Sequence, residues 1–343
     1  MNLNRRDFLK MGSLGMAAAA FPRSIAIPRQ DDFPEAEYLC RISEDTVRVH
    51  ARPHPDSTVM HYLRQDDVVE AYCRVVGQGV YDHNHVWFET PLGFVWSSYA
   101  QPVHNRSNPL LDAIPEDGTW TEVTVPYVDG RSRPDPYAPV VYRLYYAMVL
   151  NVDQRVEGSD GEIWYRVHDE NNIIMYAHGS AFRSIAAEEI APISPEVEDK
   201  VIRVRLLRQD LSAYENGVEV YYCRIASGYA YYDDDEVRRW HTPVGDWYTW
   251  RKMVSRHMAG GDAVTGYDIP GVGWTIVFTD SGEAIHSTHW HNDYGTPRSR
   301  GCVNVRPEDS KWLFRWTSPI VDYRPGDVTV RWPNRGTLIE VRE

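Results

Sequence analysis

A histidine and a cysteine sixteen residues apart, His286 and Cys302, are the residues best suited to chemistry. A thiol attacks a carbonyl group only as the thiolate, and its ordinary pKa of about 8.5 leaves little thiolate at neutral pH. Histidine is the usual base for such a thiol. We therefore predict that Cys302 is a nucleophile and His286 its general base. Gly301, directly before the cysteine, lets the backbone turn so that N–H groups point at a developing oxyanion.

The motifs around these two residues resemble those of the L,D-transpeptidases, which have a YkuD-type catalytic domain. That family carries Ile-His-Gly/Ser and, after a gap, Ser/Thr-His-Gly-Cys-Val-Asn/Arg. The corresponding segments here are Ile285-His286-Ser287 and Ser299-Arg300-Gly301-Cys302-Val303-Asn304. Upstream, Thr242-Pro243-Val244-Gly245 resembles the family's Thr-Pro-x-Gly motif, and Lys252 and Met258 fall where the family has a Lys and a Met. The resemblance covers residues 199 to about 343.

The resemblance implies a role for each matching residue. The Ser287 carbonyl would orient the His286 imidazole, Gly301 and Cys302 would supply oxyanion-hole amides, and Asn304 would be a supporting polar residue. Arg300 departs from the family, which has a histidine there. A guanidinium cannot act as a base, but it can stabilise a thiolate and hold a substrate carboxylate. The alternative is a wall-binding protein that has lost catalysis through this replacement.

Other residues near the motifs are candidates for binding. We expect Tyr267, Trp274, Trp290 and His289 to wall a groove for an extended peptide stem, although core packing accounts equally well for the aromatic residues. His286, His289 and His291 could instead ligate zinc with Cys302. Alternate residues of an extended chain point to opposite faces, so His286 need not share a face with the other two histidines. We therefore predict no metal site and no cofactor. A buried, inert thiol is the remaining alternative for the cysteine.

The implied reaction is acyl transfer in the bacterial cell wall. The enzyme would form a thioester with a peptidoglycan stem tetrapeptide and pass the acyl group to an amine, which cross-links two stems. Water as the acceptor would make the protein an L,D-carboxypeptidase instead. Carbapenem-type β-lactams are the expected inhibitors. The net charge of -13 argues against nucleic acid as a partner, because nucleic-acid binders gather Lys and Arg against phosphates.

Two stretches of the N-terminal half repeat each other. Arg52 pairs with Arg131 at an offset of 79 residues, and Trp87 pairs with Trp164 at an offset of 77. Short β-branched and aromatic runs alternate there with Pro, Asp and Gly turns, and helical periodicity is absent. Both stretches resemble bacterial SH3-like modules, the first more closely than the second. We expect both tryptophans to be core residues of small barrels rather than ligand-binding residues.

These patterns predict a mainly β protein: two small SH3-like barrels followed by a catalytic domain with a mixed sheet and one clear late helix. In the catalytic domain, we expect strands at 201–206 and 218–225 to be joined through the turn Glu215-Asn216-Gly217. A hairpin should follow at 275–286, and Pro307 should open the helix. The predicted domains are an export signal at 1–26, SH3-like modules at 37–105 and 118–190, and the catalytic domain at 199–343.

The N-terminus resembles a twin-arginine export signal. Arg5 and Arg6 precede an apolar run at 11–21, which is too short to span a bilayer, and Ser24-Ile25-Ala26 offers a cleavage site. We expect export to the cell envelope, that is the periplasm or the extracellular wall, and no integral membrane segment after signal removal. The alternative is a frayed basic N-terminus of a cytosolic protein.

The four cysteines are widely spaced and form no CxxC pair. Cys40 and Cys73 lie in the first module of a protein expected to be exported, so a disulfide between them is one possibility. Cys223 lies within an apolar run and is expected to be a core residue.

Overall fold

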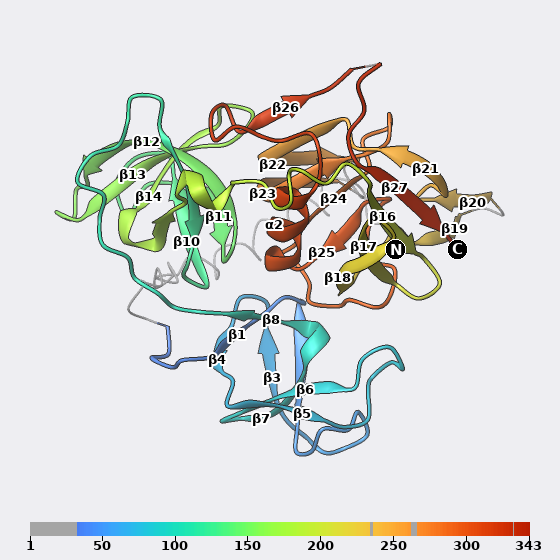
Figure 1. Ribbon diagram of the computed structural model, residues 1–343. Coiled ribbons are helices and arrows are strands. Elements are labelled where there is room, and N and C mark those ends of the chain that lie inside the picture. Colours follow the sequence, from blue (N-terminus) through green and yellow to red (C-terminus); the bar gives the residue numbers. More distant parts are fainter. Residues whose placement is uncertain (1–32, 234–235, 262–265, 332) are drawn as a thin grey trace, which may run out of the picture.

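The computed structural model describes residues 33–343 except 234–235, 262–265 and 332, so the predicted export signal at 1–26 lies outside the described residues. The described residues form six sheets and one α-helix, which confirms the mainly β fold class. Figure 1 shows three groups of strands that follow the sequence, coloured blue to cyan, green, and yellow to red. No helix in the described part of the chain is long and apolar enough to cross a membrane.

The first N-terminal domain contains two antiparallel sheets. One has five strands in the order β3-β2-β7-β6-β5, and the other has three in the order β4-β1-β8. The elements are β1 (Leu39–Ile42), β2 (Thr46–His50), β3 (Val59–Arg64), β4 (Val68–Glu70), β5 (Cys73–Val76), β6 (Val86–Thr90), β7 (Gly93–Trp96), the 3-10 helix η2 (Ser97–Tyr99) and β8 (Ala100–Val103). Apolar side chains between the two sheets form a core of their own.

The second N-terminal domain repeats this topology. Its single sheet has the order β11-β10-β14-β13-β12-β9-β15. The elements are β9 (Thr119–Val123), β10 (Tyr127–Arg131), β11 (Val140–Tyr145), β12 (Val149–Glu157), β13 (Ile163–His168), β14 (Ile174–His178), η3 (Gly179–Ala181) and β15 (Phe182–Ser184). The long strand β12 occupies the positions that β4 and β5 have in the first domain. Because β12 pairs with both β13 and β9, the second domain has one continuous sheet, whereas the first has two.

The matching strand order agrees with the internal repeat predicted from the sequence. Trp87 on β6 and Trp164 on β13 occupy equivalent places and are fully buried, as expected of core residues. The arginines are less equivalent, because Arg131 ends β10 where His50 ends β2, and Arg52 lies in the following loop. No sheet of the described residues closes on itself, so the SH3-like barrels stay a prediction.

The third domain, which the sequence predicts to be catalytic and which is called the catalytic domain below, has two five-stranded sheets and a two-stranded hairpin. The sheets have the orders β18-β17-β16-β27-β21 and β25-β24-β23-β22-β26. Their strands are β16 (Lys200–Arg205), β17 (Asp210–Glu215), β18 (Val218–Arg224), β21 (Gly245–Tyr248), β22 (Arg251–Gly260), β23 (Tyr267–Val277), β24 (Ala284–Ser287), β25 (Val303–Val305), β26 (Asp327–Thr329) and β27 (Leu338–Arg342); the hairpin is β19 (Ala230–Asp233) with β20 (Glu236–Arg239). β16 runs parallel to β27 and β24 runs parallel to β25, whereas the other pairs are antiparallel, so the sheets are mixed as predicted.

The strand β17, which lies between β16 and β18 in the sheet, was not predicted. The turn at Asn216 and Gly217, both with positive φ, joins β18 to β17 rather than to β16. β17 carries Asp210 and Ser212 on buried positions, and these polar residues obscure its apolar pattern in the sequence.

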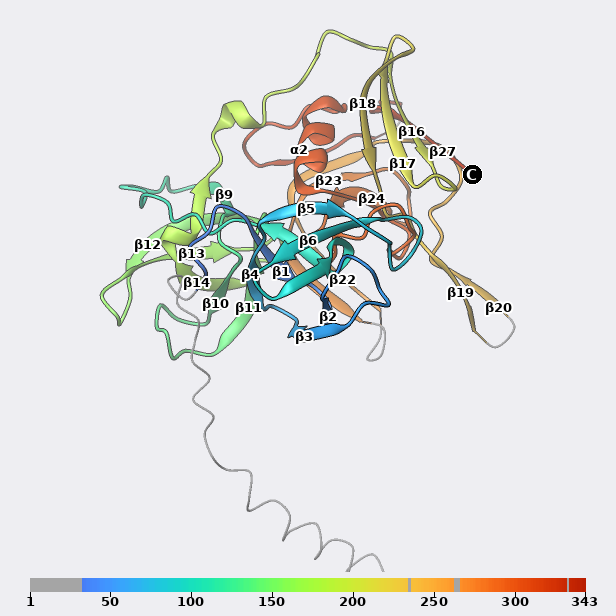
Figure 2. The same ribbon diagram turned by 90° about the horizontal axis from the view of Figure 1, so that it is seen from below.

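The helix α2 (Pro307–Trp316) begins at Pro307 as predicted. Its buried residues Leu313, Phe314 and Trp316 pack into one core with apolar residues of both five-stranded sheets. Figure 2, seen from below, shows α2 beside β23 and β24. The helix therefore supports the strand that carries His286.

The cysteines outside the predicted site are free thiols. Cys40 is buried in the core of the first domain and Cys73 is exposed on β5, so the two form no disulfide. Cys223 is buried in the core of the catalytic domain, which confirms that prediction.

Replacement of Trp164 by alanine should destabilise the second domain by about 3–5 kcal/mol, because it leaves a large cavity in a packed core. The loss also removes the hydrogen bond of 3.1 Å from the indole N–H to Asp160. Hydrogen exchange of β13 peptides during urea titration measures this change. Tyr137→Ala is the matched control, since that ring is 88% exposed; equal effects of the two substitutions would contradict the assignment.

Candidate active site

The parallel pairing of β24 with β25 brings the predicted nucleophile and base together. It places His286 opposite Asn304. Cys302, two residues before Asn304, lies beside Ala284, which is two residues before His286. Side chains of a strand alternate between its two faces. His286, Cys302, Asn304 and Ala284 therefore share one face of this sheet, although the two reactive residues are separated by a long loop.

The His286 imidazole is held in one tautomer. Its Nδ1–H donates to the Ser287 carbonyl at 2.8 Å, so the lone pair is on Nε2, where it accepts from the Asn304 side-chain amide at 3.0 Å. The carbonyl contact is the one that the family resemblance implies. Burial, together with the positive charge of Arg256 on β22, lowers the pKa of His286 to about 4. His286 is therefore a neutral base at pH 7.

The Cys302 thiol lies against a small apolar cluster formed by Met253, Val277 and Ala284. Burial raises the pKa of Cys302 to about 11, whereas a hydrogen bond from the Ala284 backbone and the positive charge of Arg256 act in the opposite direction. The resting thiol is thus protonated at neutral pH. Within the described part of the chain, no hydrogen bond joins its sulfur to His286, so the proton has to move when substrate is attacked.

The turn before the cysteine requires glycine. Gly301 has a φ of +115°, and a Cβ atom there would lie 3.0 Å from the Glu283 side chain. Its carbonyl accepts from the Thr242 hydroxyl at 2.8 Å, and its N–H donates to the Ser299 hydroxyl at 3.2 Å. Thr242 belongs to the Thr-Pro-x-Gly segment, which therefore fixes the cysteine loop directly. The Gly301 N–H that we predicted for an oxyanion hole is engaged by Ser299 in this structure.

Arg300 is held by two aromatic rings. Its guanidinium lies 4.5 Å from the centre of the Trp240 ring and 5.2 Å from that of Tyr267. The positive charge that acts on Cys302 and His286 is instead that of Arg256. Stabilisation of the Cys302 thiolate by Arg300 therefore stays a prediction.

The predicted groove residues lie in different places. Trp274 is fully buried in the core of the domain, 5.4 Å from the Phe314 ring, so core packing accounts for it. Trp290 is half-buried with its ring 5.8 Å from that of His286. His289 is buried and stacks on Tyr145 of the second N-terminal domain at 4.9 Å. Among the predicted groove residues, Trp290 and the partly exposed Tyr267 remain available to a ligand.

The sequence did not identify Arg256 or Trp240 as parts of this site, and Thr242 was noted only as part of the Thr-Pro-x-Gly motif. His291 was considered only as a zinc ligand, but its Nε2–H donates to the Asn304 side-chain oxygen at 3.1 Å. The described residues contain no group of three or more His, Cys, Asp or Glu placed to hold a metal ion. The sequence offered one signal on these histidines. Alternate residues of an extended chain point to opposite faces, so His289 and His291 were expected to share a face that His286 need not share.

Comparison with known proteins agrees with this geometry. Residues 199–341 match the sequence model of the YkuD family, the L,D-transpeptidase catalytic domain. This part of the chain is therefore similar to an L,D-transpeptidase catalytic domain. The comparison with curated proteins found no significant match. The matched segment coincides with the two five-stranded sheets and α2, and the two N-terminal domains lie outside the match.

Solved structures similar to the chain are also L,D-transpeptidases. The Ldtfm–avibactam carbamoyl enzyme is 27% identical, with a TM-score of 0.32, over 43% of this chain and 51% of that one. A mutant of the Enterococcus faecium L,D-transpeptidase is 26% identical, with a TM-score of 0.31, over the same shares. LdtMt1 in complex with imipenem is 14% identical, with a TM-score of 0.33, over 78% of this chain and 99% of that one. The chain thus covers about half the length of the first two.

The electrostatic role of Arg256 can be measured. Arg256→Gln should raise the pKa of Cys302, because the variant lacks a cation that stabilises the thiolate. It should also raise the pKa of His286, because it lacks a cation that destabilises the imidazolium. The rate of Cys302 alkylation against pH reports the first shift, and NMR titration of the imidazole the second. Arg300→Gln is the comparison variant: a smaller shift of the Cys302 pKa than in Arg256→Gln would assign the main effect to Arg256, and a larger shift would assign it to Arg300.

Proposed function

We propose that the chain is a peptidoglycan L,D-transpeptidase that forms a thioester on Cys302 with a stem tetrapeptide and transfers the acyl group to an amine. The observation that carries this proposal is the parallel pairing of β24 and β25, which puts a neutral His286 on the same face as the Cys302 thiol. The family match of residues 199–341 supports the reaction class.

In the first half-reaction, His286 takes the proton of Cys302 on Nε2 as the sulfur attacks the carbonyl carbon of the L,D peptide bond. The C–S bond forms, the C–N bond breaks, and the proton passes from His286 to the departing D-alanine amine. The apolar side chains beside the partly buried Cys302 favour the neutral thiol until the proton is taken by His286.

In the second half-reaction, an acceptor amine attacks the thioester and gives its proton to His286. The C–N bond forms, the C–S bond breaks, and the proton returns to the Cys302 sulfur. Water in place of the amine would complete an L,D-carboxypeptidase reaction by the same steps.

A wall-binding protein without catalysis is the second candidate. The observation in its favour is the packing of the Cys302 thiol against apolar side chains, with no hydrogen bond from the sulfur to His286 among the described residues. The two candidates differ in whether the thiol can be acylated.

The substrate side of the site is proposed from the exposed surface near the motif. Trp290, half-buried and beside His286, and Tyr267, which is 40% exposed, are placed to contact a peptide stem. Arg300, held between Trp240 and Tyr267, would bind a substrate carboxylate through its two-pronged guanidinium. We further propose export through the twin-arginine pathway to the cell envelope, supported by Arg5 and Arg6 ahead of an apolar run.

Carbapenem-type β-lactams should acylate Cys302. The similar solved structures include a carbamoyl enzyme with avibactam and a complex with imipenem. We expect mass spectrometry after incubation with imipenem to show a stable adduct on the Cys302 peptide, and none in Cys302→Ala. Cys73→Ala, which removes the exposed thiol on β5, is the control and should keep the adduct. An unmodified wild-type protein would favour the second candidate.

Loss of the base should make acylation depend on the thiol alone. His286→Ala should lower the acylation rate at pH 7 by about 10²-fold or more and recover part of it at high pH, since the pKa of Cys302 is raised to about 11. The pH profile of acylation measures both effects. An unchanged profile would show that another group acts as base.

A further inference from the structure

A chain of hydrogen bonds links the proposed base to the loop between β24 and β25. The Asp293 backbone N–H donates to Nδ1 of His291 at 3.2 Å, and Nε2 of His291 contacts the Asn304 side-chain oxygen at 3.1 Å. The Asn304 amide nitrogen contacts Nε2 of His286 at 3.0 Å, and Nδ1 of His286 contacts the Ser287 carbonyl at 2.8 Å. Every member of this chain is buried.

The two ends of the chain fix its direction. A backbone N–H can only donate and a carbonyl can only accept, and a neutral imidazole has one donor and one acceptor. His291 must therefore accept on Nδ1 and donate from Nε2, which leaves the Asn304 oxygen as acceptor and its NH2 group as donor. His286 then accepts on Nε2 and donates from Nδ1. Each side chain has one role that satisfies all four hydrogen bonds.

Protonation of His286 would disrupt this order. An Nε2–H on His286 would face the NH2 group of Asn304, so the amide would have to turn and present its oxygen. The NH2 group of Asn304 would then face the Nε2–H of His291. To avoid two facing donors, His291 would have to carry its proton on Nδ1 instead, where it would face the N–H of Asp293. The state of the base is therefore coupled to His291, a residue that does not touch the thiol cluster.

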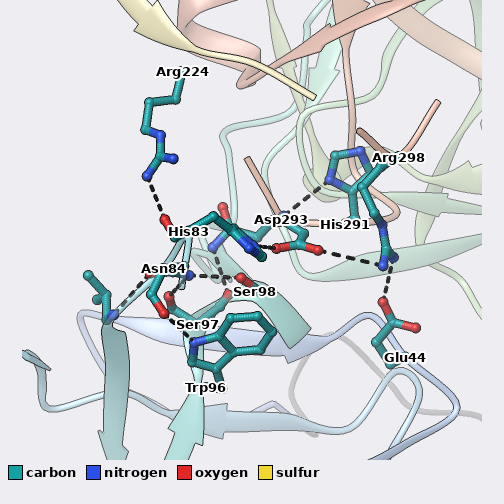
Figure 3. Close-up of polar contacts among 12 residues, drawn as sticks. Glu44, His83, Asn84, Trp96, Ser97, Ser98, Arg224, His291, Asp293 and Arg298 are labelled. Carbon is teal, nitrogen blue, oxygen red and sulfur yellow. Dashed lines mark hydrogen bonds and ion pairs between the residues drawn. The ribbon is translucent and has the colours of Figure 1, made fainter. Parts of the chain in front are cut away.

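The loop that carries His291 is held by the first N-terminal domain (Figure 3). Asp293 is 3% exposed, and its carboxylate lies 2.6 Å from Nε2 of His83 and 3.6 Å from the Arg298 guanidinium. Arg298 also pairs with Glu44 at 2.7 Å. Further contacts to the first domain are those of Asn292 to the Ser97 carbonyl at 2.9 Å, Arg224 to the His83 carbonyl at 2.8 Å, and the Arg41 guanidinium to the His289 carbonyl.

We propose that His291 is a positioning residue for the reaction, which through Asn304 keeps His286 in the tautomer with an unprotonated Nε2, and that the first N-terminal domain holds His291 in place through Asp293. This inference rests on the proposed function of His286 as base. The other charged or titratable groups that act on His286 and His291 are Arg256 on β22 and Arg298 and Asp293 in the loop. The first domain is thereby part of the catalytic apparatus.

Three variants of the full chain test the role of His291. His291→Ala should free the Asn304 amide, raise the pKa of His286 and lower the rate of Cys302 acylation by imipenem by about tenfold, the effect of one hydrogen bond of ordinary strength. His291→Gln should keep the wild-type pH profile, because its side-chain amide can still donate to Asn304. In the first domain, His83→Ala should shift the profile in the direction of His291→Ala, and His61→Ala, an exposed histidine of the same domain, should not.

The ring nitrogen shifts of His286 in ¹⁵N NMR give a readout that does not depend on activity. We expect the wild type to show its proton on Nδ1 and its lone pair on Nε2, and His291→Ala to show a mixture of tautomers or a raised pKa. A proton on Nε2 in the wild type, an unchanged His286 in His291→Ala, or equal behaviour of the Gln and Ala variants would overturn the inference. Absence of acylation in the wild type would overturn the proposed function alone, because the NMR result still decides the role of His291.

Discussion

The parallel pairing of two short strands is the constraint on which the site depends. β24 and β25 are four and three residues long, and their alignment alone decides that His286 and Cys302 share a face. Parallel neighbours cannot be joined by a tight turn and need a connection of about a dozen residues or more. The connection here, residues 288–302, contains neither helix nor strand, so its conformation must come from contacts outside its own backbone.

The two copies of the N-terminal repeat meet the catalytic domain at different places. The first holds the connection between β24 and β25, chiefly at Asp293. The second copy contacts β22 of the same sheet: Asp169 binds His257, and the Val149 carbonyl accepts a hydrogen bond from the Ser255 hydroxyl. Both copies thus support the reactive face, one through the loop and the other through the sheet. A role limited to localisation does not account for these contacts.

The nucleophile and base could be found from the sequence because their spacing and neighbours form a local motif. The same holds for Pro307 at the start of α2 and for the two buried tryptophans of the repeat. Arg256 and His291 could not be found in this way, because they act through tertiary contacts across other strands. Trp274 shows the opposite limit. Its closeness to the motif in sequence predicted a place in a groove, whereas its ring is buried in the core beside Phe314.

The first and last strands of the catalytic domain lie side by side. β16 pairs in parallel with β27, and Val201 lies opposite Leu338. During synthesis, the N-terminal domains can complete their sheets from nearby strands, whereas β16 has to wait for a partner more than 130 residues later in the chain. Contacts between residues so distant in sequence slow folding, because the entropy of closing the loop is lost before the contact forms. The catalytic domain therefore completes its sheet only after its last strand has left the ribosome, next to two domains that are able to fold before it.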